Sequence, residues 1–142
     1  MNKDDIKMVS PCGVDCADCI AHLALENTPE RNRLIVLGFK AKDLPCPGCR
    51  PLQGKCPVIG GSCETYACFE KKGIMFCYEC GEFPCVRLNP AADKADRALQ
   101  NLKVFNLCCI EKQGLEKWLS GAKEAKKKYF SGKLAYGKGP VE

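Results

Sequence analysis

Thirteen cysteines and a single histidine in a chain of 142 residues constrain this sequence more than any other feature. Because thirteen is odd, the cysteines cannot all pair with one another in disulfides. The first residues, MNKDDIKMVSPCG, contain no apolar run of the secretory type, and no stretch is long enough to span a membrane. We therefore expect a soluble, cytoplasmic protein in which dense cysteines serve metal binding or catalysis rather than disulfides.

The spacing of the cysteines favours metal binding. A CxxC pair lets two thiolates approach one ion from a tight turn, and two such pairs make a closed tetrahedral site. The turn at Cys77–Cys80 is followed by Gly81, which permits a positive φ and lets backbone N–H groups point at sulfur. Cys46-Pro-Gly-Cys49 is a second such turn. The expected metal ligands are eleven cysteines that all lie within residues 12–85, namely Cys12, Cys16, Cys19, Cys46, Cys49, Cys56, Cys63, Cys68, Cys77, Cys80 and Cys85.

Zinc is the favoured metal, with about two ions per chain, and an iron–sulfur cluster is the alternative. The spacing does not tell which cysteines share an ion. His22, three residues after Cys19, is either a further ligand or a partly buried helix residue, and the second interpretation is favoured. Cys108 and Cys109 lie in an amphipathic helical pattern and are expected to pack in the core as small hydrophobic residues.

Catalytic interpretations of the cysteines meet specific objections. Cys12-x3-Cys16-x2-Cys19 has the radical-SAM spacing, but that family needs a partial barrel longer than this chain. A zinc deaminase needs His-x-Glu, which is not found at His22. A thioredoxin-like redox pair at Cys46–Cys49 would need a helix where Arg50-Pro51 follows, and the bacterial ferredoxin run is not matched. Since hydrolytic zinc sites lean on histidine, we nominate no catalytic residue and favour a binding role over an enzyme.

The expected fold is small and mostly α-helical, with irregular cysteine-rich loops and short hairpins stabilised by metal in a single domain. Residues 1–88 form the cysteine-rich metal-binding region, 89–130 a helical region packed on it, and 131–142 a flexible basic tail. One helix is expected over about 17–26, with Ile20, Leu23 and Ala24 on its apolar face, and another from Thr28-Pro29 onward. A short strand is expected at 74–76.

Two further helices are expected after Asn89-Pro90, over about 89–113 and from Leu115, separated by Gly114. They should pack as a lid on the metal region. Basic charge gathers behind them, since residues 115–142 hold seven lysines against three glutamates. Lysines interleaved with aromatic rings, as in this tail, are the pattern of a single-stranded nucleic-acid binder, although a solvated helix end is favoured.

The combined motifs CGVDCADC, CPGCR, CETYAC, CYECGEFPC and GLEKWL are similar to an uncharacterised prokaryotic family known as domain of unknown function 3795. The resemblance covers roughly residues 10–120 and implies a cysteine-rich protein described as zinc-binding, with no established activity. The family often carries an aromatic residue near position 22, which argues against His22 as a ligand. The resemblance implies shared positions, with less support for Cys56 and Cys63, at Cys12, Cys16, Cys19, Cys46, Cys49, Cys68, Cys77, Cys80 and Cys85.

The sequence thus favours a structural metal-binding protein, with zinc as the metal, that acts as a binding or adaptor module for a protein partner. An iron–sulfur protein in electron transfer or redox enzyme assembly is the first alternative. A nucleic-acid binder that uses the Lys-rich tail is the second. No membrane partner is expected.

Overall fold

Helices dominate the regular structure of the chain. In the computed structural model, which describes residues 3–142, about 47% of the chain is helical. The α-helices are α1 Lys3–Lys7, α2 Ile20–Leu23, α3 Pro29–Val36, α4 Glu64–Lys72, α5 Lys103–Gln113 and α6 Leu115–Ser131. Single turns of 3-10 helix are η1 Cys16–Asp18, η2 Ala41–Asp43, η3 Cys77–Glu79 and η4 Leu99–Leu102. The expectation of a small, mostly α-helical fold is therefore confirmed.

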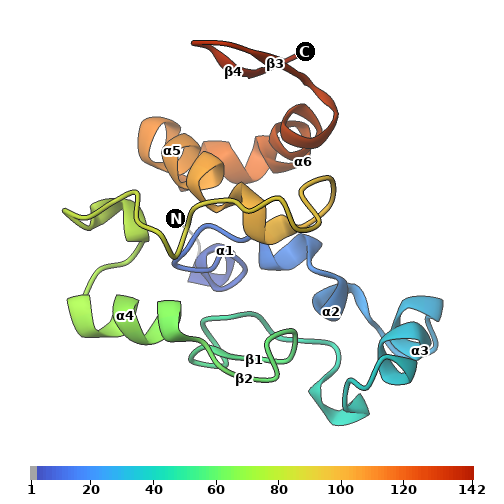
Figure 1. Cartoon of the computed structure of the whole chain (residues 1–142). Helices are drawn as coiled ribbons and strands as arrows, with labels where there is room; N and C mark the ends of the chain where they lie inside the picture. The colour runs from blue at the N-terminus through green and yellow to red at the C-terminus, as the bar shows by residue number, and fades with distance from the viewer. Residues whose placement is uncertain (1–2) are drawn as a thin grey trace.

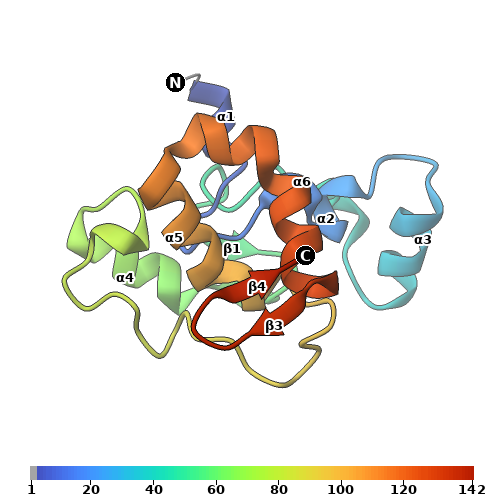
Figure 2. The ribbon, with the colours of Figure 1, turned by 90° about the horizontal axis from the view of Figure 1, so that it is seen from above.

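The strands form two small antiparallel hairpins. β1 Lys55–Cys56 pairs with β2 Gly61–Ser62, and β3 Lys133–Ala135 pairs with β4 Gly139–Val141. The pair α5–α6 lies on one side of the molecule, with β1, β2 and α4 on the opposite side and α1 and α2 between them (Figure 1). Seen from above, α3 and α4 lie on opposite flanks of this stack (Figure 2). The helical pair and the hairpin β1–β2 thus lie on opposite sides of the chain's middle layer (Figure 1).

The larger apolar core joins this helical pair to the loops beneath it. Trp118 and Leu107 are almost completely buried, and segments far apart in the chain supply the other members of the cluster. The buried members are Val9, Phe76, Leu88, Leu107, Ile110, Leu115 and Trp118. Four of these seven side chains come from α5 and α6. Apolar burial thus fastens the pair to the rest of the chain.

A second, smaller core lies under α2 and α3. Its buried members are two alanines, two leucines and one cysteine, which are Ala21, Ala24, Leu34, Leu44 and Cys46. Arg31 closes this unit, since its guanidinium donates to the backbone oxygens of Leu44 at 2.6 Å and Ala41 at 2.8 Å. These bonds compensate for a core with few large side chains.

Of the two helices expected in the cysteine-rich region, one begins where predicted and the other is much shorter than expected. α3 begins as predicted, with Pro29 in its first turn and the Thr28 hydroxyl accepting from the backbone N–H of Arg31 at 3.3 Å. The helix expected over 17–26 is reduced to η1 and α2. Its expected apolar face is only partly found, because Ala24 is buried as expected, whereas Ile20 and Leu23 are 42% and 47% exposed and Ala21 is buried instead. Small residues are needed there because the chain packs closely against residues 44–46.

Other local predictions were wrong in informative ways. Residues 74–76 form no strand, and Phe76 instead leads into η3 with its ring buried. Helix after Asn89-Pro90 begins only at Leu99, because residues 89–98 run as turns in which Lys94 has φ +53°. Gly114, with φ +86°, does separate α5 from α6. The hairpin of β3 and β4 was missed, since it falls in the expected tail.

Candidate metal centre

All eleven expected ligand cysteines line one of two cavities. The larger, of about 970 Å³, is lined by seven of them, Cys12, Cys16, Cys19, Cys46, Cys49, Cys56 and Cys63. The smaller, of about 240 Å³, is lined by the remaining four, Cys68, Cys77, Cys80 and Cys85. Cys108 and Cys109 line neither cavity. The fold thus divides the cysteines into two sets that the spacing in the sequence does not reveal.

The opening CGVDC segment of the larger cavity is fixed against α5. Gly13 has φ +90°, and a Cβ atom there would lie 2.7 Å from the backbone oxygen of Lys103, so only glycine fits. The Asn106 side chain donates to the Gly13 oxygen at 2.7 Å from a buried position. Asp15 caps η1 by accepting from the backbone N–H of Ala17 at 3.0 Å. Gly13 and Asp15, which lie between the first two cysteines, are therefore required by the local structure.

The CPGCR segment forms the second wall of this cavity. Gly48 has φ +107°, and its backbone N–H acts to lower the pKa of the Cys46 thiol, although burial has the larger, opposite effect. Arg50 then leaves the cavity and donates to the backbone oxygens of Val9 at 2.8 Å and Met75 at 2.7 Å. Its guanidinium also lies 4.9 Å from the ring centroid of Phe76. The arginine of this motif joins three segments of chain.

The smaller cavity lies between α4 and the turn at η3. Cys80 receives a hydrogen bond from the backbone N–H of Glu82 at 3.4 Å, so an N–H group points at sulfur here too. Gly81 does not contribute in the expected way, because it is not among the glycines with positive φ in the described chain. Glu79 accepts from the backbone N–H groups of Met75 and Phe76, at 3.0 and 3.3 Å. This carboxylate therefore caps η3, which gives it a structural role.

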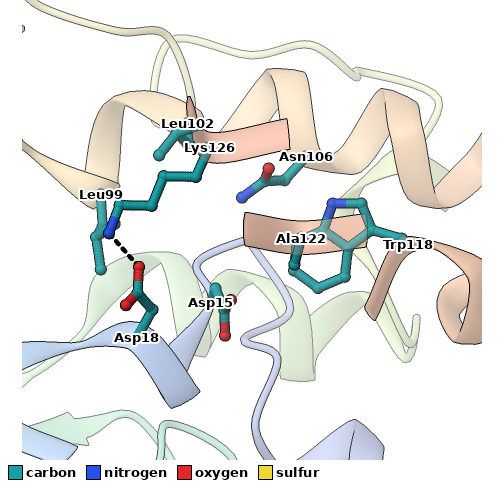
Figure 3. Close-up of a pocket in the computed structure, with 8 residues that line it drawn as sticks. All are labelled: Asp15, Asp18, Leu99, Leu102, Asn106, Trp118, Ala122 and Lys126. Carbon is teal, nitrogen blue, oxygen red and sulfur yellow. Dashed lines mark hydrogen bonds and ion pairs between the residues drawn. The ribbon is translucent and has the colours of Figure 1, made fainter. Parts of the chain in front are cut away.

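The remaining carboxylates near the cysteines are also engaged. Glu82 pairs with Lys72 from α4, and Asp18 pairs with Lys126 from α6. Figure 3 shows Asp18 and Lys126 meeting beside Asp15, Asn106 and Trp118, where the helical pair covers η1. Burial raises the pKa of Asp15. The ion pair between Asp18 and Lys126 ties α6 to η1, and that between Glu82 and Lys72 ties α4 to the turn after η3.

Burial favours the neutral form of two of the thiols in particular, Cys16 and Cys77. Burial, followed by the nearby Cys19, Cys12 and Cys46, raises the pKa of Cys16 to about 12. Burial also raises the pKa of Cys77 to about 12, with Cys12 and Cys85 next in effect. Since the thiolate is the form that binds metal, loading of these sites must release protons. Mutual repulsion among thiolates would be relieved by an ion between them.

Positive charge surrounds the larger cavity. Five basic side chains line it, together with the acidic Asp18 and Glu64, and these are Arg87, Lys94, Arg97, Lys103 and Lys126. Arg87 pairs with Glu64 at 2.9 Å, and most of the basic side chains come from residues 87–103, whose place beside the cysteines no sequence motif indicates. Four thiolates around one divalent ion carry net negative charge. The basic lining is therefore electrostatically matched to a thiolate-rich centre.

The donor atoms share cavities without forming a coordination shell. Within residues 3–142, no group of three or more His, Cys, Asp or Glu side chains is arranged so that it could hold a metal ion. Their chemistry nevertheless fits zinc or an iron–sulfur cluster, because the donors are thiols supported by backbone N–H groups. Any ion would have to draw these sulfurs inward.

The prediction that Cys108 is buried was wrong, and the structural roles of Asn106 and Arg50 were not predicted. Cys108 is exposed on α5 rather than buried, whereas Cys109 packs on the larger core as expected. Asn106 and Arg50 hold the cavity walls through backbone oxygens distant in sequence. Asn106 lies within an apolar helix pattern, and such a polar residue is itself a signal for a buried hydrogen bond.

The fold and the two cavities define a class of small, cysteine-rich helical proteins with thiols gathered at defined places. A family profile makes this specific, since DUF3795, described as a protein of unknown function, matches residues 8–90. The chain belongs to this family, which the sequence motifs already resembled. No curated protein and no solved structure matches the chain. In residues 3–142, none of the helices combines the length and the apolar character that a membrane crossing requires.

Proposed function

We propose that this protein is a zinc-stabilised binding module whose cysteine-rich region is organised by zinc and presented to a protein partner. One observation carries the proposal: all eleven expected ligands, and neither of the other two cysteines, line the two cavities. Buried free thiols scattered as core packing would not divide in this way. Thiolate ligation makes such sites closed and structural rather than hydrolytic.

Each cavity also has the supporting groups that thiolate ligands need. The backbone N–H of Glu82 donates to Cys80, that of Gly48 acts to lower the pKa of Cys46, and basic side chains surround the larger cavity. These groups stabilise negative charge on sulfur. About two ions are expected, one for each cavity.

An iron–sulfur protein is the second candidate, and the size of the larger cavity favours it. Seven cysteines around about 970 Å³ leave more room than a single zinc ion needs. Cluster ligation by four cysteines would use part of this set. Electron transfer or redox enzyme assembly would then be the role.

Metal analysis after anaerobic purification separates these candidates. Colourless protein with about two or more zinc ions per chain supports the zinc module. Brown protein with iron and sulfide, and broad visible absorption, supports the iron–sulfur candidate. Anaerobic handling is needed because oxygen can destroy a cluster and leave zinc in its place. A chain that carries no metal, and takes up none when both are offered, would contradict both.

A further inference from the structure

Part of the larger cavity is lined by apolar side chains that neither the cores nor the expected metal ligands account for. Ile20, Val58 and Ile59 line the cavity although they are 42%, 47% and 54% exposed. Within residues 3–142, neither apolar core includes them. Ile20 begins α2, and the other two lie in the turn between β1 and β2. Large aliphatic side chains left exposed at a cavity are typical of a ligand-binding site, because a ligand can still cover them.

A basic segment lines the same cavity. Residues 87–103 run beside the pair α5–α6, whereas the hairpin β1–β2 lies on the opposite side of the molecule (Figure 1). Because residues from both line the cavity, it lies between them. Lys94 and Lys103 are the lysines of this segment, and neither forms an ion pair with a carboxylate of residues 3–142. Two cations thus face the cavity without an acidic partner.

The basic segment is held in place by contacts of its own. The buried side chain of Asn101 exchanges hydrogen bonds with the backbone of Ala91, at 2.8 and 3.2 Å, which closes the turns that carry Lys94. The Lys103 amine donates to the backbone oxygen of Arg87 at 3.5 Å. Because the backbone is already ordered, a ligand that binds here does not have to order it.

The charge of the whole lining also favours an anion. Five basic side chains against Asp18 and Glu64 leave an excess of three positive charges. Four thiolates on one divalent ion contribute about two negative charges, so a loaded metal centre does not cancel this excess. His22 is a further lining residue, but its Nδ1 is occupied by the backbone oxygen of Cys46 at 2.7 Å. The unpaired lysines are therefore the groups left to attract an anionic ligand.

We infer that the larger cavity binds a small organic anion with an apolar body, a carboxylate or a phosphate ester. Lys94 and Lys103 hold its charged group, and the aliphatic side chains at 20, 58 and 59 contact its body. The volume of about 970 Å³ lies within the range of about 300–1,000 Å³ that is typical of small-molecule sites. This binding goes beyond the proposed function, and none of the residues that it uses is an expected metal ligand.

Probes that share one apolar chain and differ in charge test this inference. Octanoate, octyl phosphate, octanol and octyltrimethylammonium are titrated into the full chain as purified, and its amide signals are followed by NMR. We expect at least one of the two anions to bind about tenfold or more tightly than octanol and than the cation, because a contact with a charged group adds to apolar burial. The shifted signals should gather at residues 20, 58, 59, 94 and 103. Anions that bind no more tightly than octanol, or that shift only residues outside the cavity, would overturn the inference.

Paired lysine variants separate this site from a general effect of charge. Lys94→Gln with Lys103→Gln should weaken binding of the anion about tenfold or more and leave the affinity for octanol unchanged. Lys123→Gln with Lys127→Gln is the matched control, because it removes the same charge from exposed positions outside the larger cavity. This control should bind the anion as the wild type does. Equal losses in the two double variants would overturn the inference.

The apolar contact and the metal are measured in the same samples. Ile59→Gln should weaken both the anion and octanol, whereas Leu134→Gln, at a side chain 73% exposed outside the cavity, should weaken neither. Metal content should equal that of the wild type in every variant. A chain that holds metal but binds none of the probes would overturn this inference alone. A chain that holds and takes up no metal, but binds an anion in the cavity, would contradict the proposed function and support this inference.

Discussion

The cysteine-rich residues 12–85 and the helical pair differ in how much apolar surface they bury. The longest helix in residues 12–85 is α4, with nine residues, whereas α5 and α6 have eleven and seventeen. The helical pair contributes Leu107, Ile110, Leu115 and Trp118 to the larger core. The smaller core under α2 and α3 has only leucines, alanines and one cysteine, while Val36 beside it is 87% exposed.

This difference teaches that two parts of one small chain can depend on different forces. Short elements with a small core do not bury enough apolar surface to offset the entropy of ordering them. Bound metal can supply that missing free energy, since apparent binding energies for structural zinc are about 10–16 kcal/mol. The helical pair has its own apolar burial, so under the proposed function it should depend less on metal. Each prediction below tests this contrast.

The largest effect is expected from removal of metal. Strong chelation should remove hydrogen-exchange protection from residues 12–85, because each lost ion takes on the order of 10 kcal/mol with it. The helices α5 and α6 should keep part of their helical signal. Circular dichroism and hydrogen exchange, before and after verified metal removal, measure both regions in one sample. Unchanged protection of residues 12–85 in metal-free protein would break the comparison.

The next effect separates cysteines that line a cavity from one that does not. Cys77→Ser and Cys80→Ser should each lose the ion of the smaller cavity and lower solubility, because a hydroxyl is a poor substitute for a thiolate. Cys108→Ala should keep its metal and change the free energy of unfolding by less than about 0.5 kcal/mol, since this side chain is exposed. Elemental analysis measures the metal. A lower metal content in the Cys108 variant would show that α5 contributes a ligand.

The pH dependence of stability has opposite signs for neutral and metal-bound thiols. A neutral Cys16, whose pKa rises from 9.0 to about 12 on folding, keeps its proton when the unfolded chain loses it. The contribution of such a thiol to the free energy of unfolding is fully present below pH 9 and falls as the pH rises from 9 toward 12. A metal-bound thiolate behaves in reverse, because protons displace the ion on acidification.

We expect the acid-sensitive behaviour for residues 12–85. Hydrogen exchange, corrected for the intrinsic rate at each pH, should show lost protection together with metal release as the pH falls below about 6. Protection should stay constant between about pH 8 and 10. A fall in protection above about pH 9 without change in the acid would indicate packed neutral thiols, and would remove the difference between the two regions.

A smaller effect is expected within the helical pair. Leu107→Ala removes a fully buried side chain from the larger core and should lower the free energy of unfolding by about 2–5 kcal/mol. Its metal content should not change. Val36→Ala, at a side chain 87% exposed on the other region, should cost less than about 0.5 kcal/mol. Denaturant titration measures both, and equal costs would mean that the larger core is not what stabilises the pair.

Local signals in the sequence predict the helices whose ends are marked by special residues. Thr28-Pro29 places the start of α3, and Gly114 places the break between α5 and α6, because capping and positive φ are local properties. The turns at 89–98 could not be predicted in this way. There the side chain of Asn101 exchanges hydrogen bonds with the backbone of Ala91, at 2.8 and 3.2 Å, and tertiary contact replaces helix.

The candidate ligands could be predicted as a set but not as two groups. Thiol chemistry and CxxC spacing are visible in the sequence, whereas the division between cavities depends on how distant segments pack. Cys12 and Cys63 line one cavity although 50 residues lie between them, while Cys68, only five positions after Cys63, lines the other. The helix α4, which starts at Glu64, carries Cys68 away from the first set. The orientation of His22 likewise depends on a carbonyl 24 positions away.

The smallest effect concerns the lysines at the end of the helical pair. Lys123, Lys127 and Lys128 are exposed, but Lys126 pairs with Asp18, and the neighbouring Tyr129 is occupied internally. Its hydroxyl donates to the Asn101 oxygen at 2.8 Å, and its ring lies 5.4 Å from that of Phe105. A stacking platform for unpaired bases needs accessible rings beside the cations, and Tyr129 does not offer one. The exposed ring of Tyr136 lies in the turn between β3 and β4 and not on α6 with these lysines.

We therefore expect no binding of single-stranded RNA or DNA up to about 10 µM protein at physiological salt, where non-specific complexes dissociate at about 1–100 µM. Fluorescence anisotropy at low and physiological salt measures this. The triple variant Lys123→Gln, Lys127→Gln and Lys128→Gln is a better control than truncation, because it leaves Tyr129 and the ion pair of Lys126 in place. Binding in the wild type that the variant abolishes, with metal content unchanged, would make the helical pair a nucleic-acid surface. Equal and negligible binding leaves these lysines as solvated charge on α6, where Lys128 in the last turn interacts favourably with the helix dipole.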